Sequence, residues 1–445
     1  MPDTLVPSEP TTPAMAVPED PAAIPARSAR PLLLQRDFAA LWWGQLISLW
    51  GDRINYLALN GLVQQHTRDY HDPGQSSLML SLHGTVSVLP VLLFAPFAGP
   101  WVDRWNLRRV LIVSDVVRAL LVLAIPVVYA ATHHAAPVWS MVFLMFTCNV
   151  FFLPAKSAMT PEIVPKEQLL SANTLLAVAG IIGTVVGFAM GGWVVDHWGW
   201  QVALTMDAIT YGVSVVSLSL IRYRPRARTS AEVTIGGYWQ EIVEGLRVVR
   251  GSPAVGLALT ALGAVWLGGG FIQVAGIQHI QRAASIPGAE RIAGLGGALG
   301  IGAALSTWWV NTRGRRAPRP LLLGVGMVLA GVWLVCMAVS TRYAVFVIAS
   351  FLIGASIAPA FVLTETLVQE GTDLHQRGRV FSLRDFAMRS LLLGSLALAT
   401  VLTPLLGTTP TLIVAAVCIA GAGVLSMAWG RRARELMSVP PRAPR

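Results

Sequence analysis

Twelve apolar runs of about 20 residues constrain the fold of this chain more than any other feature, because a helix of that length crosses a hydrocarbon core of about 30 Å. They cover residues 38–64, 77–98, 108–131, 138–160, 170–195, 201–221, 254–280, 292–312, 320–340, 343–368, 382–403 and 408–430. Hydrophobic residues make up 54% of the chain and charged residues 13%, which excludes an ordinary soluble globule. We predict an all-α membrane protein with twelve transmembrane helices.

The net charge of +10 raises the question of nucleic-acid binding, so the placement of the arginines matters. They concentrate in alternate loops and after the last run, at Arg104, Arg108, Arg109, Arg222, Arg224, Arg226, Arg228, Arg313, Arg315, Arg316, Arg319, Arg377, Arg379, Arg431, Arg432 and Arg434. The intervening loops hold only Arg68, Arg282, Arg291 and Arg342. This is the positive-inside pattern of a multi-pass protein with both termini in the cytoplasm. It predicts a bacterial cytoplasmic membrane and the lipid bilayer, rather than nucleic acid, as the partner of this charge.

No pattern in the sequence indicates catalysis, a metal or a cofactor. Cys148, Cys336 and Cys418 all fall inside the apolar runs without paired spacing, so we expect no disulfide framework and no metal site. The chain also lacks the glycine-rich loop that holds nucleotide phosphates, which argues against direct use of ATP. We expect a protein that is not an enzyme and that carries no cofactor.

A polar, basic segment in the middle of the chain divides it in two. Within it, apolar side chains follow helical spacing, at Trp239, Ile242, Val243, Leu246 and Val249. They predict either an amphipathic helix on the cytoplasmic surface or a plain helical linker. The expected organisation is a disordered tail over 1–36, a six-helix bundle over 37–222, the linker over 223–252, a second six-helix bundle over 253–431 and a basic tail over 432–445.

Two pairs of residues recur at nearly the same offset in the two halves. Arg108-Arg109 lies 207 positions before Arg315-Arg316, and Pro154-Ala155 lies 205 positions before Pro359-Ala360. Offsets that agree this closely indicate a six-helix unit duplicated in parallel. Transporters built from duplicated halves bind their substrates near the membrane midplane, between the halves.

A short charged turn separates the second and third runs. It contains Gly99, Asp103, Arg104, Arg108 and Arg109 between long apolar segments. One interpretation is a gate, in which Asp103 and the arginines hold the cytoplasmic helix ends together in one state and release them in another. Asp103 would then also face the charges of the eleventh run, at Arg384, Asp385 and Arg389. The alternative is a solvated basic turn that only fixes topology.

This turn resembles the signature loop of the major facilitator superfamily, where a glycine, an aspartate and several arginines recur in this order. The segment from Pro154 to Asn173 resembles the connection between spans four and five in the branch of enterobactin exporters and macrolide efflux pumps. Further matches are Gln45 with Gly51-Asp52, Asp115 to Arg118, Asp207-Ala208, Glu244 to Arg247 and Arg377 to Val380. The resemblance covers about residues 35–430. It implies two pseudo-symmetric six-helix bundles and a secondary active transporter.

A polar stripe runs down the otherwise apolar first run. Gln45, Ser48, Asp52 and Asn55 are spaced by three, four and three residues, so they share one helix face. An ionisable side chain within a membrane is costly and should face the bundle interior or water. We interpret Asp52 as a proton-coupling carboxylate, with Gln45 and Asn55 beside it as substrate-binding candidates. The alternatives are a structural ion pair of Asp52 with Arg118 or Arg53, and a position of Asp52 at the water-exposed end of the span.

Other charged residues within the runs have more than one interpretation. Glu365 in the tenth run is a second candidate for binding protons or cationic substrate, or it lies only near the cytoplasmic mouth. Asp115 and Arg118, at positions i and i+3, can pair on one helix face and support the gate. Asp207 is expected to begin the sixth span and to cap or anchor its helix.

Together these patterns predict a proton-coupled exporter of a small amphipathic molecule, such as a drug, a macrolide-like compound or a siderophore. Its partners would be that molecule, protons and the bilayer, and we expect a monomer. Two alternatives stay open: a lysophospholipid or lipid flippase of the same fold, and a membrane sensor or scaffold that transports nothing.

Overall fold

The computed structural model describes residues 31–68, 73–222, 235–283, 289–313, 318–372 and 374–437, and these residues are almost entirely helical. The first half of the chain forms η1 (Leu32–Leu34), α1 (Arg36–Arg68), α2 (Pro73–Arg104), α3 (Leu107–Thr132), α4 (Ala135–Ile163), η2 (Lys166–Gln168) and α5 (Leu169–Ser219). At Gly199 the backbone of α5 adopts φ +84°, a conformation that glycine alone adopts readily, and the helix turns back there. The fifth and sixth expected spans are the two passes of α5.

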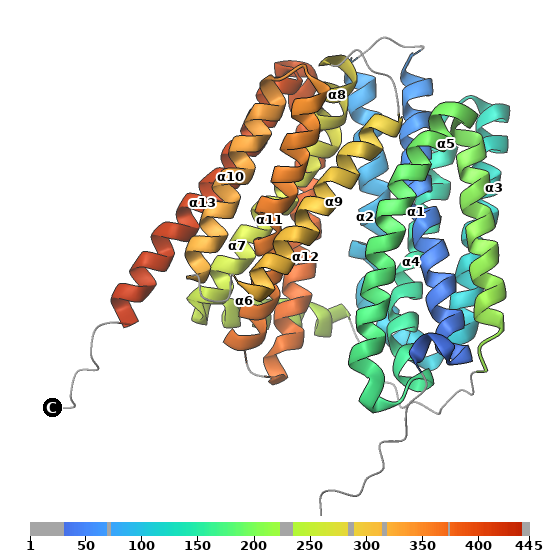
Figure 1. Cartoon of the computed structure of the whole chain (residues 1–445), viewed down its shortest axis with the longest axis horizontal. Helices are drawn as coiled ribbons and strands as arrows, with labels where there is room; N and C mark the ends of the chain where they lie inside the picture. Colours follow the sequence, from blue (N-terminus) through green and yellow to red (C-terminus); the bar gives the residue numbers. More distant parts are fainter. Residues whose placement is uncertain are drawn as a thin grey trace, which may run out of the picture.

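The second half begins with the linker helix α6 (Ile235–Gly251). It continues with α7 (Pro253–Phe271), the π-helical turn η3 (Ile272–Gly276), α8 (Ile277–Ala283), α9 (Ala289–Thr312), α10 (Arg319–Val339), α11 (Tyr343–Gly371), α12 (Leu374–Leu406) and α13 (Thr408–Met437). Figure 1 shows α1–α5 as one bundle beside a second bundle of α7–α13.

Ten helical stretches in the described residues are long and apolar enough to cross a membrane, and one of them is Ser171–Ser219, which passes twice. Helix α1 is not among the ten, but it runs for 33 residues alongside α5. With α1 added and α5 counted twice, the described chain has the twelve expected passes.

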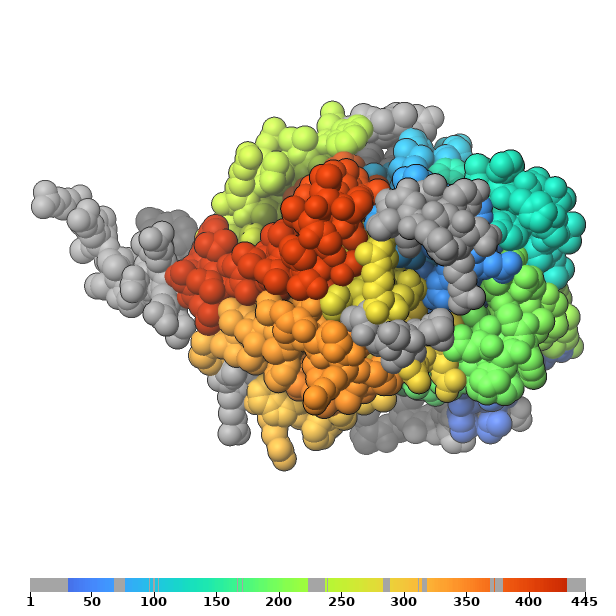
Figure 2. Space-filling model, turned by 90° about the horizontal axis from the view of Figure 1, so that it is seen from above, coloured from blue at the N-terminus to red at the C-terminus, as the bar shows by residue number. Residues whose placement is uncertain are grey.

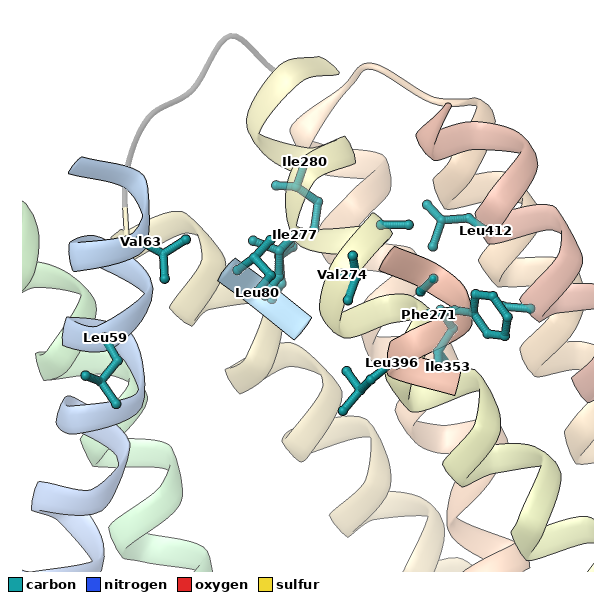
Figure 3. Packing of buried hydrophobic residues seen from close by; sticks show 14 of the residues in the cluster. Leu59, Val63, Leu80, Phe271, Val274, Ile277, Ile280, Ile353, Leu396 and Leu412 are labelled. Atoms are coloured by element: carbon teal, nitrogen blue, oxygen red, sulfur yellow. The ribbon is translucent and has the colours of Figure 1, made fainter. Parts of the chain in front are cut away.

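The two ends of the bundle differ in how they hold the halves together. We call the end that carries Gly199 and the first residues of α2 and α9 the Gly199 end, and the opposite end, with Asn106 and the start of α1, the Asn106 end. A buried apolar cluster joins both halves, and Figure 3 shows part of it, with Leu59 and Val63 on α1, Leu80 on α2 and Ile277 on α8. Figure 2 views the Gly199 end, where the yellow segment of the second half reaches the blue and green segments of the first.

Close packing of α1 against both passes of α5 depends on glycine. A Cβ atom added at Gly187 would lie 2.7 Å from the backbone oxygen of Trp50, and one added at Gly51 would lie 2.4 Å from Oδ1 of Asp207. Small residues let helices approach in this way inside a membrane. They bring the polar stripe of α1 against α5.

The segment boundaries differ in detail from those expected. Leu32 is buried in the turn η1, so ordered structure begins before the expected end of the tail at residue 36. Helix α13 continues to Met437, beyond the expected end of the bundle at residue 431. Residues 1–30, 223–234 and 438–445 lie outside the described part of the chain.

The linker does form a helix, and that helix packs against α12. The Arg379 Nε of α12 lies 2.8 Å from the Glu244 Oε2 of α6, and the rings of Trp239 and Phe386 meet edge to face with centroids 5.2 Å apart. The linker helix is therefore attached to the second bundle at its Asn106 end.

Candidate substrate cavity

A cavity of about 250 Å³ lies within the first half of the protein, and we call it the first-half cavity. Helices α1 to α5 line it with Gln45, Ser48, Leu49, Asp52, Arg53, Asn55, Tyr56, His83, Arg118, Met145, Phe146, Asn149, Phe152, Leu153, Lys156 and Tyr211. The whole polar stripe of α1 is among these residues, since the spacing that places four side chains on one helix face directs them all into the same space.

Asp52 is the only residue with a carboxylate among those that line this cavity. Its Oδ1 accepts a hydrogen bond of 2.6 Å from the Tyr211 hydroxyl of α5. Asp52 is half-buried, and within the described part of the chain it forms no ion pair with Arg118 or Arg53. Asp52 nevertheless interacts electrostatically with Arg118 and Lys156, so its role as a proton-coupling carboxylate stays a prediction.

Arg118 pairs with Asp115 one turn earlier on α3, as their spacing allows. The pair is fully inside the bundle, with Asp115 at 0% exposure and Arg118 at 3%. The Arg118 guanidinium also lies over the rings of Phe152 and Tyr211, with its Cζ 4.5 and 4.6 Å from the ring centroids. Side chains of α3, α4 and α5 thus surround the buried guanidinium of Arg118. This residue lines the cavity and pairs with the Asp115 carboxylate.

Asp207 does not cap a helix. It lies eight residues after the turn at Gly199, has 0% exposure, and accepts a 2.7 Å hydrogen bond at Oδ2 from Asn55 of α1. The Thr210 hydroxyl donates to its backbone carbonyl at 2.7 Å. Asp207 therefore anchors α1 to the second pass of α5. Of the two expected roles, anchoring agrees with this contact, and capping does not, because the helix begins earlier than Asp207.

Glu365 lies apart from the first-half cavity. It borders a separate cavity of about 450 Å³ between α7, α11 and α12. Its Oε2 accepts a 2.7 Å hydrogen bond from Arg384, whose guanidinium also contacts Asp385. The Glu365 side chain is 51% exposed. The structure does not bring Asp52 and Glu365 into one site.

In the charged turn, the Arg108 side chain contacts backbone carbonyls. Arg108 donates from Nε to the Leu218 carbonyl at 3.1 Å, and also to the Ser219 carbonyl, at the end of α5. The Arg109 backbone N–H donates to the side chain of Asn106, which caps α3. Cations at a helix C-terminus satisfy its last carbonyls, so Arg108 fastens the end of α5.

The remaining members of the predicted gate cannot be placed in the same way. Arg104 is exposed at the end of α2. Gly99 and Asp103 lie on α2, but the side chain of Asp103 lies outside what the structure describes, and so does its expected contact with Arg384, Asp385 and Arg389. A gating role of this turn, with support from Asp115 and Arg118, remains a prediction.

Several residues of this region were not singled out from the sequence. Tyr211 lies four residues after Asp207, and that spacing was the available signal that both face α1. Lys156 lines the cavity from α4 and stands inside the Pro154–Asn173 segment. Asp196 accepts hydrogen bonds from the backbone N–H groups of Ala289 at 2.6 Å and Glu290 at 2.8 Å. No local pattern distinguishes that aspartate from a solvated one.

Proteins with similar sequences bear the names of transporters. Macrolide efflux protein A of Streptococcus pyogenes is 24% identical over 233 residues, which are 52% of this chain and 55% of that protein, so the chain matches only about half of its length. The putative bacilysin exporter BacE of Bacillus subtilis is 27% identical over 363 residues, or 78% of this chain and 83% of that protein. An uncharacterised MFS-type transporter of Mycobacterium tuberculosis is 24% identical over 424 residues, which are 90% of this chain and 93% of that protein.

Solved structures share the fold. A bacterial homologue of the human lysosomal transporter Spinster superposes with a TM-score of 0.68 at 12% identity, covering 89% of this chain and 97% of that one. A mutant of the nucleoside transporter NupG superposes with a TM-score of 0.67 at 13% identity, covering 90% of this chain and 100% of that one. A family model described as the Major Facilitator Superfamily matches residues 41–391. The chain therefore belongs to the major facilitator superfamily.

Proposed function

We propose that this protein is a secondary active transporter that exports a small amphipathic molecule by proton-coupled alternating access. The observation that carries the proposal is Asp52, a carboxylate on the wall of a cavity inside the membrane-spanning bundle. The names of its relatives, an efflux protein and an exporter, support the outward direction. Asp115 and Asp207 are fully buried and already bonded to Arg118 and Asn55, which leaves Asp52 to exchange protons with the cavity.

The geometry also supports one access state. Among the described residues, the side-chain hydrogen bonds between the halves lie nearer the Gly199 end: Tyr56 to Gln273, Gln278 to Ser77, Ser81 to the Leu396 carbonyl, and Asp196 with the start of α9. Lys156, two turns before the end of α4, extends the first-half cavity toward the Asn106 end. With the arginine-rich loops in the cytoplasm, this state would load substrate from inside the cell.

A transport screen tests the proposal. Inverted membrane vesicles containing the protein would be energised with a proton gradient and offered a panel of amphipathic antibiotics and siderophores. We expect at least one compound to accumulate, and collapse of the gradient by a protonophore to abolish its accumulation. Accumulation that survives the protonophore would refute proton coupling. No accumulation of any compound, with the protein correctly folded, would refute export of this class.

Opening of the Gly199 end should depend on Asp196. Replacing it in Asp196→Ala removes the acceptor for two backbone N–H groups of α9, and loss of such a cap costs about 1–2 kcal/mol. That free energy corresponds to roughly a 5- to 30-fold shift between two states. We expect an impermeant maleimide added on the Gly199 side to label a cavity cysteine, Ser48→Cys in a background without other cysteines, faster by that factor.

Asp196→Asn is the graded control, since its amide oxygen still accepts one of the two hydrogen bonds from α9 while its NH2 group cannot accept the other. It should label at a rate between those of the parent and Asp196→Ala. Equal labelling rates in the parent and in Asp196→Ala would show that this contact does not hold the end closed.

A further inference from the structure

The lining of the first-half cavity carries both signs of charge. Asp52 is its one acidic residue, and its basic residues are Arg53, Arg118 and Lys156. Arg118 is matched by Asp115 directly behind it, so its charge is already compensated. The charges available to a ligand are therefore one carboxylate and the two cations Arg53 and Lys156.

Lys156 is the least satisfied of these groups. Its side chain is half-buried on α4, and in the described part of the chain its ammonium has no hydrogen bond and no ion pair. Its compensating charge is Asp52, which also lines the cavity and acts on it electrostatically. Arg53, by contrast, donates to Thr184 at 3.3 Å and lies over the ring of Phe188 at 5.8 Å. A half-buried ammonium that no anion contacts directly is weakly stabilised, and an anionic ligand group in contact with it would stabilise it further.

Two further polar atoms in the cavity wall have no hydrogen-bond partner among the described residues. They are the Oε1 of Gln45 and the Nδ1 of His83, which are buried although both residues line the cavity. Buried polar groups in native proteins are nearly always satisfied, and a site that binds a polar ligand is a recurrent exception. These atoms are available to a ligand that carries hydrogen-bonding groups.

We propose that the cargo of the first-half cavity is a small zwitterionic amphiphile, whose ammonium group binds Asp52 and whose carboxylate binds Lys156. The proposal rests on the export function proposed above and specifies its substrate class. Asp52 lies at the middle of α1, whereas Lys156 lies two turns from the end of α4. The bound molecule is then oriented, with its carboxylate toward the Asn106 end.

The two simpler charge classes fit less well. A cation without an acidic group would enter a cavity in which the cations Lys156 and Arg53 outnumber Asp52, and like charges repel strongly where water is scarce. An anion without a basic group would be repelled by ionised Asp52 and would bind together with a proton. Export by proton exchange instead requires proton and cargo to compete for Asp52, as an ammonium group does.

The size and the apolar part of the cavity restrict the cargo further. Pockets for drug-sized ligands are about 300–1,000 Å³, so a cavity of about 250 Å³ holds a molecule with one or two rings. Leu49, Phe146 and Leu153 supply an apolar wall for such a ring system.

A charge-matched set of four naphthyl compounds tests the proposal by calorimetry on the purified full-length protein. The set is 1-naphthylalanine as the zwitterion, 2-(1-naphthyl)ethylamine as the cation, 3-(1-naphthyl)propanoate as the anion and its amide as the neutral compound. At about pH 7.5 the amino and carboxyl groups are ionised as named. We expect naphthylalanine to bind about 10-fold more tightly than the cation or the anion, as one additional charge-assisted contact predicts.

Two variants assign the contacts separately. Lys156→Met should make naphthylalanine bind no better than the amine, while Lys156→Arg, which keeps the charge, should restore most of the preference. Asp52→Asn should make naphthylalanine bind no better than the propanoate. Equal affinity of the amine and naphthylalanine for the parent, an unchanged preference in Lys156→Met, or no binding of naphthylalanine would each overturn the proposal.

A transport measurement separates this inference from the proposed function. Naphthylalanine that binds with the expected pattern but does not respond to a proton gradient in proteoliposomes would refute the transport function and leave the binding class intact. Proton-driven transport of the amine with no advantage for naphthylalanine would refute the zwitterion and leave the transport function intact.

Discussion

Arg118→Met is expected to yield protein that is poorly folded, with a loss of roughly 3–5 kcal/mol, because it leaves the buried Asp115 carboxylate without its partner. Asp115 has 0% exposure, so water cannot replace the guanidinium. The substitution also removes the cation from its positions over Phe152 and Tyr211. The measurement is the thermal unfolding midpoint in detergent, together with the yield of monodisperse protein.

The double variant Asp115→Leu with Arg118→Met is the control for this interpretation. It removes both charges and keeps apolar volume, and buried ion pairs can be replaced in this way at little cost. It should recover most of the lost thermal stability. The unfolding midpoint of Arg118→Lys should lie between those of Arg118→Met and the parent, since lysine keeps the charge but lacks the planar group that contacts both rings. An unfolding midpoint equal to the parent's in Arg118→Met, or no recovery in the double variant, would contradict the assigned role of the pair.

The architecture could be predicted from the sequence because the membrane imposes a length on every span. Twelve apolar runs predicted twelve passes, and even the sharp turn at Gly199 lies in the gap left between the runs 170–195 and 201–221. Helix α1 was identified despite its charges because its apolar residues continue on both sides of Asp52. Boundaries such as Leu32 and Met437 were harder to predict from the sequence, since helices continue beyond the hydrocarbon region into residues of any composition.

The candidate site was predictable only in part, because its other half comes from distant segments. Helical spacing alone placed Gln45, Asp52 and Asn55 on one face. The hydroxyl that contacts Asp52 belongs to Tyr211, 159 positions later, and no local pattern predicts that α5 brings it there. The partner through which Asp207 anchors its helix was not predictable for the same reason, since Asn55 is on another helix.

The charged turn shows the limit of reading charge without geometry. Arg108 was grouped with the other arginines as part of a gate, yet its guanidinium binds the last carbonyls of α5. A sequence reports that a residue is charged, but whether its partner is a carboxylate or a helix end depends on which segments meet. Lys156 was overlooked for a related reason, since no local pattern shows that α4 places it on the wall of the cavity that Asp52 also lines.

Asp52→Asn is expected to abolish proton-driven accumulation of the cargo while leaving the protein folded. The amide cannot ionise, so it can neither take up nor release a proton, but its Oδ1 can still accept the hydrogen bond that Tyr211 donates at 2.6 Å. Gradient-driven uptake into inverted vesicles should fall to the level of vesicles without the protein. Exchange of labelled for unlabelled cargo, which needs no net proton movement, should continue, with an affinity about 10-fold weaker if one charged contact is lost.

The comparison of these two measurements makes the prediction specific, because a protein that merely misfolds would lose exchange as well. Glu365→Gln is the matched control: it removes a carboxylate from the separate cavity near α12, where Glu365 pairs with Arg384 at 51% exposure, and should retain proton-driven uptake. Tyr211→Phe should also retain coupling, since Asp52 keeps its charge when the hydroxyl is removed. If Asp52→Asn accumulates cargo as the parent does, the coupling carboxylate is not Asp52. If Glu365→Gln alone loses accumulation, the coupling carboxylate lies in the second half and not on α1.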